Sequence, residues 1–100
     1  MKAVWNGQVI AEAPQDELIR IEGNWYFPPL SVKRAFLIDS ATHTTCFWKG
    51  EASYYSISVN GEINTDAAWY YPDPKDGSVE RVRNNFANFV AFWHGVEVIE

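Results

Sequence analysis

Short runs in which apolar and polar residues alternate follow one another along most of the chain, which is the period expected of β-strands. The run Lys2–Trp5 is followed by a turn signal at Asn6–Gly7, and apolar residues resume within Gln8–Ala13. This order predicts an N-terminal hairpin. A further strand is predicted over Glu17–Ile21 and the residues after it, and Pro28–Pro29 ends that strand because proline donates no backbone hydrogen bond.

Two short segments show the helical period instead. The spacing of their apolar residues, at i, i+3 and then i+4 or i+7, predicts one helix over Ser31–Leu37 and a second over Ser78–Phe86. The elements predicted after the second helix are a strand over residues 88–93, a turn at His94–Gly95 and a closing strand over Val96–Ile99.

The central hairpin runs from Ala52 to Tyr71, and its register decides which side chains share a face. A two-residue turn at Asn60–Gly61 would place Ser58 opposite Ile63 and would mix polar and apolar side chains on both faces. A three-residue loop, Val59–Gly61 with a bulge at Gly61, gathers the apolar side chains on one face. We predict this second register.

The predicted register gives the hairpin one buried face, which includes Trp69, and one polar face. On the polar face Tyr54 lies across from Asp66, with Tyr70 further along the same face. Two tyrosines and a carboxylate on one surface would line a ligand cleft. A solvated hairpin face is the alternative, and the spacing does not decide between them.

The composition indicates one globular domain that is rich in aromatic residues. A chain of 100 residues holds a single core, so we expect one domain over residues 1–100. Hydrophobic residues make up 47% and charged residues 21%, a balance that argues against disorder. Aromatic residues reach 16%, with five Trp, so we expect those outside the core to lie in a pocket or an interface.

The charge and hydropathy exclude two classes of partner. The net charge is −5, and the eight Lys and Arg residues are scattered, whereas a nucleic-acid-binding surface needs clustered positive charge. No stretch approaches the roughly 18 apolar residues of a membrane span, and the first residues lack a leader pattern. We therefore expect no nucleic-acid partner, no membrane partner and a cytoplasmic location.

Three longer segments, EGNWYFPP, THTTCFWKGEASYYS and NTDAAWYYPDP, precede a C-terminal part that contains VAFW and VEV. Together they resemble the bacterial family catalogued as domain of unknown function 427, in the same order and over nearly the whole chain. The combination of Cys-x-x-Lys-Gly with Asp-Ala-Ala-Trp-Tyr-Tyr-Pro-x-Pro is specific. The family's usual cysteine motif has proline after the cysteine, where this chain has Phe47.

The resemblance implies a mainly β, β-tent-like fold, in which two antiparallel sheets lean against each other, here with two short helices. Methionine-R-sulfoxide reductases and the thalidomide-binding domain of cereblon are in this fold group, and many members hold a structural zinc through paired Cys-x-x-Cys motifs. This chain has only Cys46, so we expect no zinc and no other cofactor. The resemblance implies no assigned activity, and the nucleotidyltransferase label sometimes attached to the family has no matching motif here.

Cys46 is a candidate catalytic nucleophile, with Lys49 or His43 as the group that would lower the pKa of its thiol. Residues three apart in a strand point to opposite faces, so neither neighbour faces Cys46 unless a turn intervenes. A lone cysteine in an apolar stretch is most often an inert core residue. Asp66 and His94 would complete a metal-ligand set with His43 and Cys46, but their spacing matches no known motif, so we expect no metal.

Aromatic residues around the central hairpin are the stronger candidate site, because a largely apolar cleft with a few polar groups suits a small ligand. We predict that Lys49 supplies one of the polar groups. The alternative is that the Trp residues are core, that Lys49 is a solvated loop residue and that Asp73 only sets a turn. The predicted ligand-binding residues are Trp48, Tyr54, Asp66, Tyr70 and Asp73.

We therefore expect a protein that binds a small molecule or a short peptide in this aromatic-lined cleft. One alternative is an enzyme that uses Cys46 as a nucleophile or redox thiol, assisted by Lys49 or His43. Another is a structural or interaction module that forms a homodimer through an aromatic patch such as Trp25–Phe27.

Overall fold

Nine β-strands and one α-helix make up most of the computed structural model, which describes residues 1–100. The prediction of a mainly β fold is confirmed. No helix is both long enough and apolar enough to cross a membrane. The elements are β1 (Lys2–Trp5), β2 (Gln8–Glu12), β3 (Ile19–Ile21), β4 (Asn24–Tyr26), β5 (Leu37–Cys46), β6 (Gly50–Val59), β7 (Glu62–Tyr70), α1 (Ser78–Val82), β8 (Val90–Phe92) and β9 (Glu97–Ile99), with 3₁₀ turns at Gln15–Glu17, Pro29–Ser31 and Arg34–Phe36.

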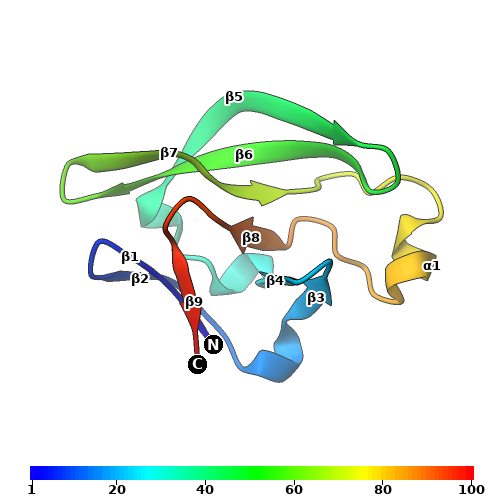
Figure 1. The fold of residues 1–100 in the computed structure, drawn as a ribbon, viewed down its shortest axis with the longest axis horizontal. Coiled ribbons are helices and arrows are strands. Elements are labelled where there is room, and N and C mark those ends of the chain that lie inside the picture. Colours follow the sequence, from blue (N-terminus) through cyan, green and yellow to red (C-terminus); the bar gives the residue numbers. More distant parts are fainter.

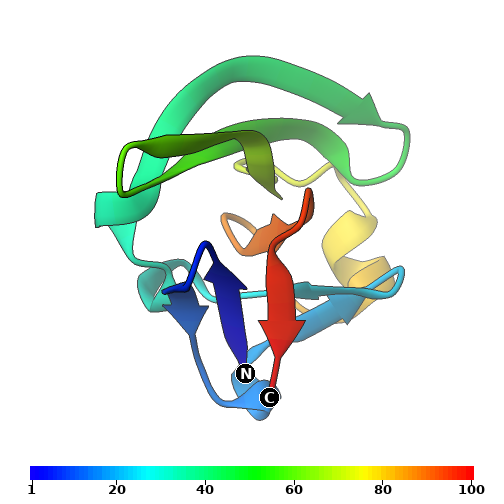
Figure 2. The ribbon, with the colours of Figure 1, turned by 60° about the vertical axis from the view of Figure 1, so that its left-hand side comes forward.

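The strands pair in antiparallel fashion and form three sheets rather than the two that we expected. Strands β5, β6, β7 and β8 form the largest sheet in that order, β1 lies between β2 and β9, and β3 pairs with β4. In Figure 1 the long strands β5, β6 and β7 form one layer, and the two smaller sheets lie below it. Figure 2 shows β9 beside β1, so the two termini lie close together.

The terminal elements agree with the sequence. Asn6 and Gly7 have φ values of 51° and 73°, as a two-residue hairpin turn requires, so the predicted N-terminal hairpin is confirmed. The predicted strand over residues 88–93 contains β8, and the closing strand contains β9. His94–Gly95 turns the chain between these strands with positive φ at both residues.

Two clusters of buried side chains hold the layers together. The larger cluster joins β1 and β2 to the large sheet and includes Ile10, Phe27 and Ile57. The smaller cluster joins β3 and β4 to the part of the large sheet near α1. In the smaller cluster Trp69 is 8% exposed, and its indole N–H donates to the Tyr26 hydroxyl at 3.1 Å. The prediction that Trp69 is a core residue is confirmed.

The predicted register of the central hairpin is wrong. Asn60–Gly61 forms a two-residue turn, with φ values of 51° and 80°, and Val59 pairs with Glu62. A two-residue turn alone would mix polar and apolar side chains on each face of the hairpin. A bulge further along, where Ser56 of β6 faces Thr65–Ala67 of β7, shifts the pairing and separates them again. Near the turn, Ile63 remains 60% exposed. The bulge, rather than the turn, therefore brings the apolar side chains of the two strands into line.

The bulge also changes which aromatic side chains share a face. Tyr54 pairs with Trp69, not with Asp66 as we predicted, and both belong to the smaller cluster. On the opposite face the rings of Tyr55 and Tyr70 stack with their centroids 4.5 Å apart. Both faces of this part of the hairpin are packed against protein, so the predicted polar face does not exist.

Only one of the two predicted helices forms. The segment predicted as a helix over Ser31–Leu37 instead contains one 3₁₀ turn, Arg34–Phe36, and the last residue of another. The backbone N–H of Lys33 donates to the carbonyl of Ile10 and ties the segment to β2, so a continuous helix does not form. Helix α1 forms as predicted but is shorter. It ends where Arg83 adopts a left-handed conformation with φ of 67°, which releases Phe86 into the core.

Candidate functional site

The loop between β5 and β6 brings the Cys-x-x-Lys-Gly motif into contact with the end of the Asp-Ala-Ala-Trp-Tyr-Tyr-Pro-x-Pro motif. This loop, Phe47–Lys49, is docked against the segment Asp73–Lys75 by a hydrogen bond from the backbone N–H of Lys75 to the carbonyl of Lys49, 2.9 Å long. Gly50 has a φ of 109°, and a Cβ at this position would lie 3.1 Å from the Lys75 backbone nitrogen. Only glycine fits this conformation and this close approach.

The side chain of Lys49 is buried inside this end of the molecule. It is 6% exposed, and its ammonium group donates to a Glu22 carboxylate oxygen at 2.5 Å. The same ammonium lies 5.2 Å from the centre of the Tyr71 ring and 5.4 Å from that of Trp48. Lys49 therefore supports the Trp48 loop from inside and does not reach solvent as a free amine.

The pKa values of these groups follow from their contacts. Burial lowers the pKa of Lys49, but the hydrogen bond that its ammonium donates to Glu22 and the charge interactions with Tyr26 and Tyr71 raise it by more, so the net pKa lies above its usual range. The hydrogen bond from Lys49 holds the pKa of Glu22 below its ordinary value. Burial raises the pKa of Tyr71 to about 12. At neutral pH the site thus contains an ammonium–carboxylate pair beside a neutral phenol.

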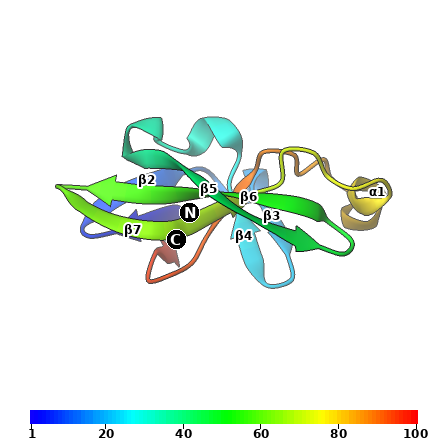
Figure 3. The same ribbon diagram turned by 90° about the horizontal axis from the view of Figure 1, so that it is seen from above.

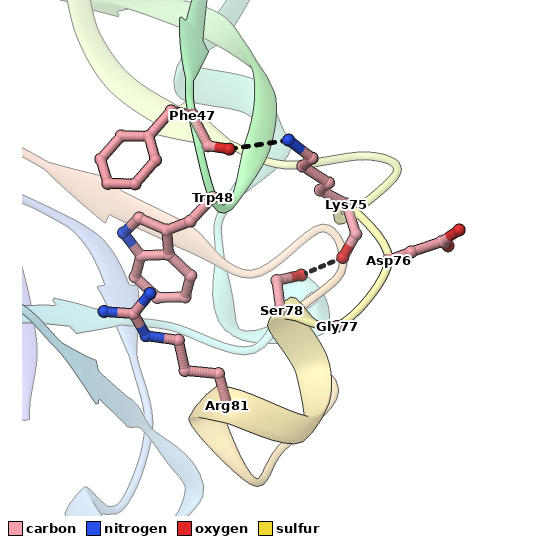
Figure 4. Close-up of a pocket in the computed structure, with 7 residues that line it drawn as sticks. All are labelled: Phe47, Trp48, Lys75, Asp76, Gly77, Ser78 and Arg81. Atoms are coloured by element: carbon pink, nitrogen blue, oxygen red, sulfur yellow. Dashed lines mark hydrogen bonds between the residues drawn. The ribbon is translucent and has the colours of Figure 1, made fainter.

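Two hollows open to the surface beside Trp48. The first has a volume of about 270 Å³ and the second about 300 Å³. Trp48 and Arg81 line both, and the guanidinium carbon of Arg81 lies 4.3 Å from the centre of the Trp48 ring. We call the two together the Trp48–Arg81 site. The first hollow, drawn in Figure 4, is lined by Phe47, Trp48, Lys75, Asp76, Gly77, Ser78 and Arg81, and the second by Arg20, Ile21, Glu22, Trp48, Arg81 and Val82.

The elements that carry this site come from three distant parts of the sequence. The β5–β6 loop supplies Trp48, α1 supplies Arg81, and β3 with the turn after it supplies the wall of the second hollow. Figure 3 shows α1 at one end of the large sheet and the turn between β6 and β7 at the other. The Trp48–Arg81 site therefore lies at the α1 end of the molecule.

The structure does not gather the predicted ligand-binding residues into one cleft. Trp48 lines both hollows, and Asp73 lies beside them, where its carbonyl lies against Gly50. Tyr54 is buried, with its hydroxyl 2.9 Å from the hydroxyl of Thr44. Tyr70 lies on the other face of the sheet, against Tyr55.

Asp66 lies at the bulge and is surrounded by hydrogen-bond donors. The hydroxyl groups of Ser40 and Thr42 donate to its two carboxylate oxygens at 2.5 and 2.8 Å, and these two bonds hold the pKa of Asp66 below its ordinary value. Its backbone N–H donates to the hydroxyl of Ser56 at 3.0 Å, and the indole N–H of Trp93 donates to its carbonyl at 2.6 Å. Asp66 lines none of the hollows and fixes the bulge in place.

Cys46 is half-buried and packs against the smaller core cluster. The two neighbours that would activate its thiol are engaged elsewhere: Lys49 with Glu22, and His43 with the hydroxyl of Ser53 at 3.2 Å. No three His, Cys, Asp or Glu side chains lie close enough together to hold a metal ion. This geometry gives the enzyme alternative no hydrogen-bonded base beside the thiol.

Sequence reasoning missed the cationic side chains of the site. Arg81 lies on the predicted second helix, so its exposure was foreseeable, but its contact with Trp48 joins residues that are far apart in sequence. Arg20 and Lys75 were likewise not singled out, although both line hollows. The one local indication in the sequence was the segment Lys75–Gly77, whose Asp-Gly pair marks a turn before the second helix.

Comparison with known proteins gives a family but no activity. No curated protein matches the chain. The model of a family described as a domain of unknown function, DUF427, matches residues 1–99 and confirms the resemblance seen in the sequence. The chain therefore belongs to the family of domain of unknown function 427.

Proposed function

We propose that the protein binds a small molecule at the Trp48–Arg81 site. The observation that carries this proposal is that one tryptophan ring, stacked on a guanidinium group, forms a wall of two adjacent hollows. Ligand sites are typically concave, with volumes from roughly 300 Å³ upward, and combine apolar rings with a few polar groups. The second hollow, of about 300 Å³, is at the lower limit of that range, and the first, of about 270 Å³, is just below it.

The rigidity of the Trp48 loop supports the same proposal. The Lys75 side chain donates to the carbonyl of Phe47 at 2.9 Å, its backbone N–H donates to Lys49, and Lys49 is itself held by Glu22. A loop fixed by several independent bonds loses little entropy when a ligand binds. The loop thus presents a ring to solvent without having to be ordered by the ligand.

The site suits a small molecule better than a peptide. A peptide that occupied both hollows would have to pass over the Trp48–Arg81 stack that separates them. A planar molecule needs only one hollow and one ring face. The experiment below therefore includes a short peptide as the competing ligand.

Nuclear magnetic resonance of ¹⁵N-labelled protein tests the proposal, with 2-naphthol and an acetylated, amidated Ala-Trp-Ala peptide as probes. We expect 2-naphthol to shift the Trp48 indole N–H signal and the amide signals of Gly77 and Ser78. Trp48→Leu should abolish these shifts. Trp93→Leu is the matched control, since Trp93 is 44% exposed and lines neither hollow.

Two results would contradict the proposal. Shifts centred on Trp93 and His94 would place binding elsewhere. Shifts caused by the peptide alone would show that the site takes a peptide rather than a small molecule.

A further inference from the structure

We infer that the ligand of the Trp48–Arg81 site carries a carboxylate or phosphate group that binds Arg81, with a planar part against the aromatic rings. This inference rests on the proposed function and specifies its ligand. It is carried by the distribution of charge, the orientation of Asp76 and the geometry of Arg81.

The charge around Trp48 is opposite in sign to that of the whole protein. The net charge of the chain is −5, yet the hollows are lined by the cations Arg20, Lys75 and Arg81 against the acids Glu22 and Asp76. Glu22 is already neutralised by the buried ammonium of Lys49. The site therefore holds an excess of positive charge, which attracts anions.

The remaining acid does not face the first hollow. Figure 4 shows the carboxylate of Asp76 pointing away from both Trp48 and Arg81. Arg81 takes part in none of the three salt bridges of the chain, which join Lys2 to Glu12, His43 to Glu51 and Lys49 to Glu22. The guanidinium of Arg81 is thus in direct contact with no carboxylate, and the acid whose pKa its charge helps to lower, Glu22, is already bonded to Lys49.

The geometry of Arg81 suits an anion. Its guanidinium carbon lies over the Trp48 ring, 4.3 Å from the ring centre, and none of the guanidinium N–H groups donates a hydrogen bond within the protein. A guanidinium edge donates two parallel hydrogen bonds to a carboxylate or a phosphate. Phe47, which is 80% exposed beside the same hollow, offers a second ring for the planar part of the ligand.

Four probes that share one ring and differ in their head group test the inference. They are 1-naphthoate, 1-naphthyl phosphate, 1-naphthamide and 1-naphthylmethylamine, titrated by calorimetry. We expect at least one of the two anions to bind roughly tenfold more tightly than the neutral amide, which is the effect of one charge-assisted hydrogen bond, and the amine to bind most weakly. The order of the two anions shows which head group the site prefers.

Variants separate recognition by Arg81 from general attraction to positive charge. Arg81→Gln should lower the affinity for the preferred anion roughly tenfold more than it lowers the affinity for 1-naphthamide, which loses only the packing of the guanidinium. Arg81→Lys should recover only part of the loss, because an ammonium lacks the planar fork. Lys33→Gln removes the same charge from an exposed position outside the hollows and should change neither affinity.

The results that overturn the inference differ from those that overturn the proposed function. Equal affinities for naphthoate, naphthyl phosphate and naphthamide, all lost in Trp48→Leu, would refute the anionic ligand and leave small-molecule binding in place. Affinities that are unaffected by Trp48→Leu, in a variant shown by circular dichroism to be folded, would refute both. Equal losses in Arg81→Gln and Lys33→Gln would show a net-charge effect and would also refute the inference.

Discussion

The α1 end of the molecule and the bulge at its centre each hold a charged side chain, but they stabilise its charge by different means. At the α1 end the ammonium of Lys49 is matched by the carboxylate of Glu22. At the bulge, Asp66 is matched by the neutral hydroxyls of Ser40 and Thr42. Hollows lie beside the first group and none lies beside the second.

This difference shows how one polar cluster is structural while another leaves room for a ligand. The hydroxyls at the bulge satisfy both carboxylate oxygens and add no charge of their own, so nothing remains for a ligand to bind. At the α1 end the carboxylate of Glu22 is bonded to Lys49, and Arg81 lies next to an aromatic ring without a salt bridge of its own. An excess of charge beside a hollow is therefore a better indicator of a site than a charged residue itself.

The largest effect is expected at Trp69, which lies between the two regions. Its ring packs edge-on against Tyr26 on one side and Trp93 on the other, with centroids 6.1 and 5.2 Å apart. Trp69→Ala should lower the free energy of unfolding by about 3–5 kcal/mol, measured in denaturant. Trp69→Phe, which keeps a ring, should cost less. A loss below about 1 kcal/mol for the alanine variant would place Trp69 outside the core.

Gly50→Ala should separate the Trp48 loop from the segment that supports it. The added methyl group would meet the Lys75 backbone nitrogen at 3.1 Å and the Asp73 carbonyl at 3.3 Å, in a left-handed backbone conformation. We expect a loss of about 1–3 kcal/mol in unfolding free energy together with weaker binding of 2-naphthol. Gly23→Ala is the matched control, because Gly23 is also left-handed but has open space around it. Equal effects of the two variants would show that the close contact at Gly50 is unimportant.

Lys49→Met tests the ion pair and its dependence on pH. Because the Glu22 side chain is 55% exposed and can regain water, we expect a loss of about 1–2 kcal/mol at neutral pH, less than the ~3–5 kcal/mol for a fully buried pair. The folded state lowers the pKa of Glu22, so its contribution is present above the unfolded value of about 4.3 and is lost as pH falls through the folded pKa. The difference between the two proteins should therefore narrow in acid. If the difference in unfolding free energy between the two proteins stayed constant with pH, the variant would have lost only side-chain packing and not the ion pair.

Asp66→Asn should have the smallest effect. The amide keeps an acceptor for one hydroxyl and tolerates the left-handed backbone at this position, where φ is 53°, so we expect a loss of about 0.5–1 kcal/mol at neutral pH. The pKa of Asp66 is lowered in the folded state, so this difference should also disappear as pH falls through that pKa. Binding of 1-naphthoate should not change. A weaker affinity for 1-naphthoate in this variant would contradict the contrast between the two regions.

The sequence was sufficient for features that depend on neighbouring residues. Alternation and turn residues located the N-terminal hairpin, β8, β9 and the start of α1. It failed where a distant contact decides the local conformation. The bond between Lys33 and Ile10 prevents a helix, and the hydroxyls around Asp66 stabilise a bulge that shifts the hairpin register.

The same limit applies to the site. The sequence singled out Trp48, which lines both hollows, and Lys49, which lies buried beneath the same loop, because rings and a cation next to a turn glycine are visible along the chain. It grouped Trp48 with Tyr54 and Tyr70, since the predicted register placed both tyrosines on one face. The partnership of Trp48 with Arg81 depends on how α1 folds back onto the loop, and no spacing within the chain encodes it.

The bulge at Asp66 also sets how far β7 extends relative to β6. Between the turn and the bulge, Ile57 pairs with Asn64, and that register would carry Gly50 opposite Tyr71. Beyond the bulge, Tyr55 pairs with Ala68, and the shifted register carries Gly50 opposite Asp73. Without the bulge, the segment that docks under the Trp48 loop would lie two residues, or about 7 Å, too far along the strand. A local irregularity in the middle of the sheet thereby determines whether the Trp48 loop and the segment that supports it meet at its end.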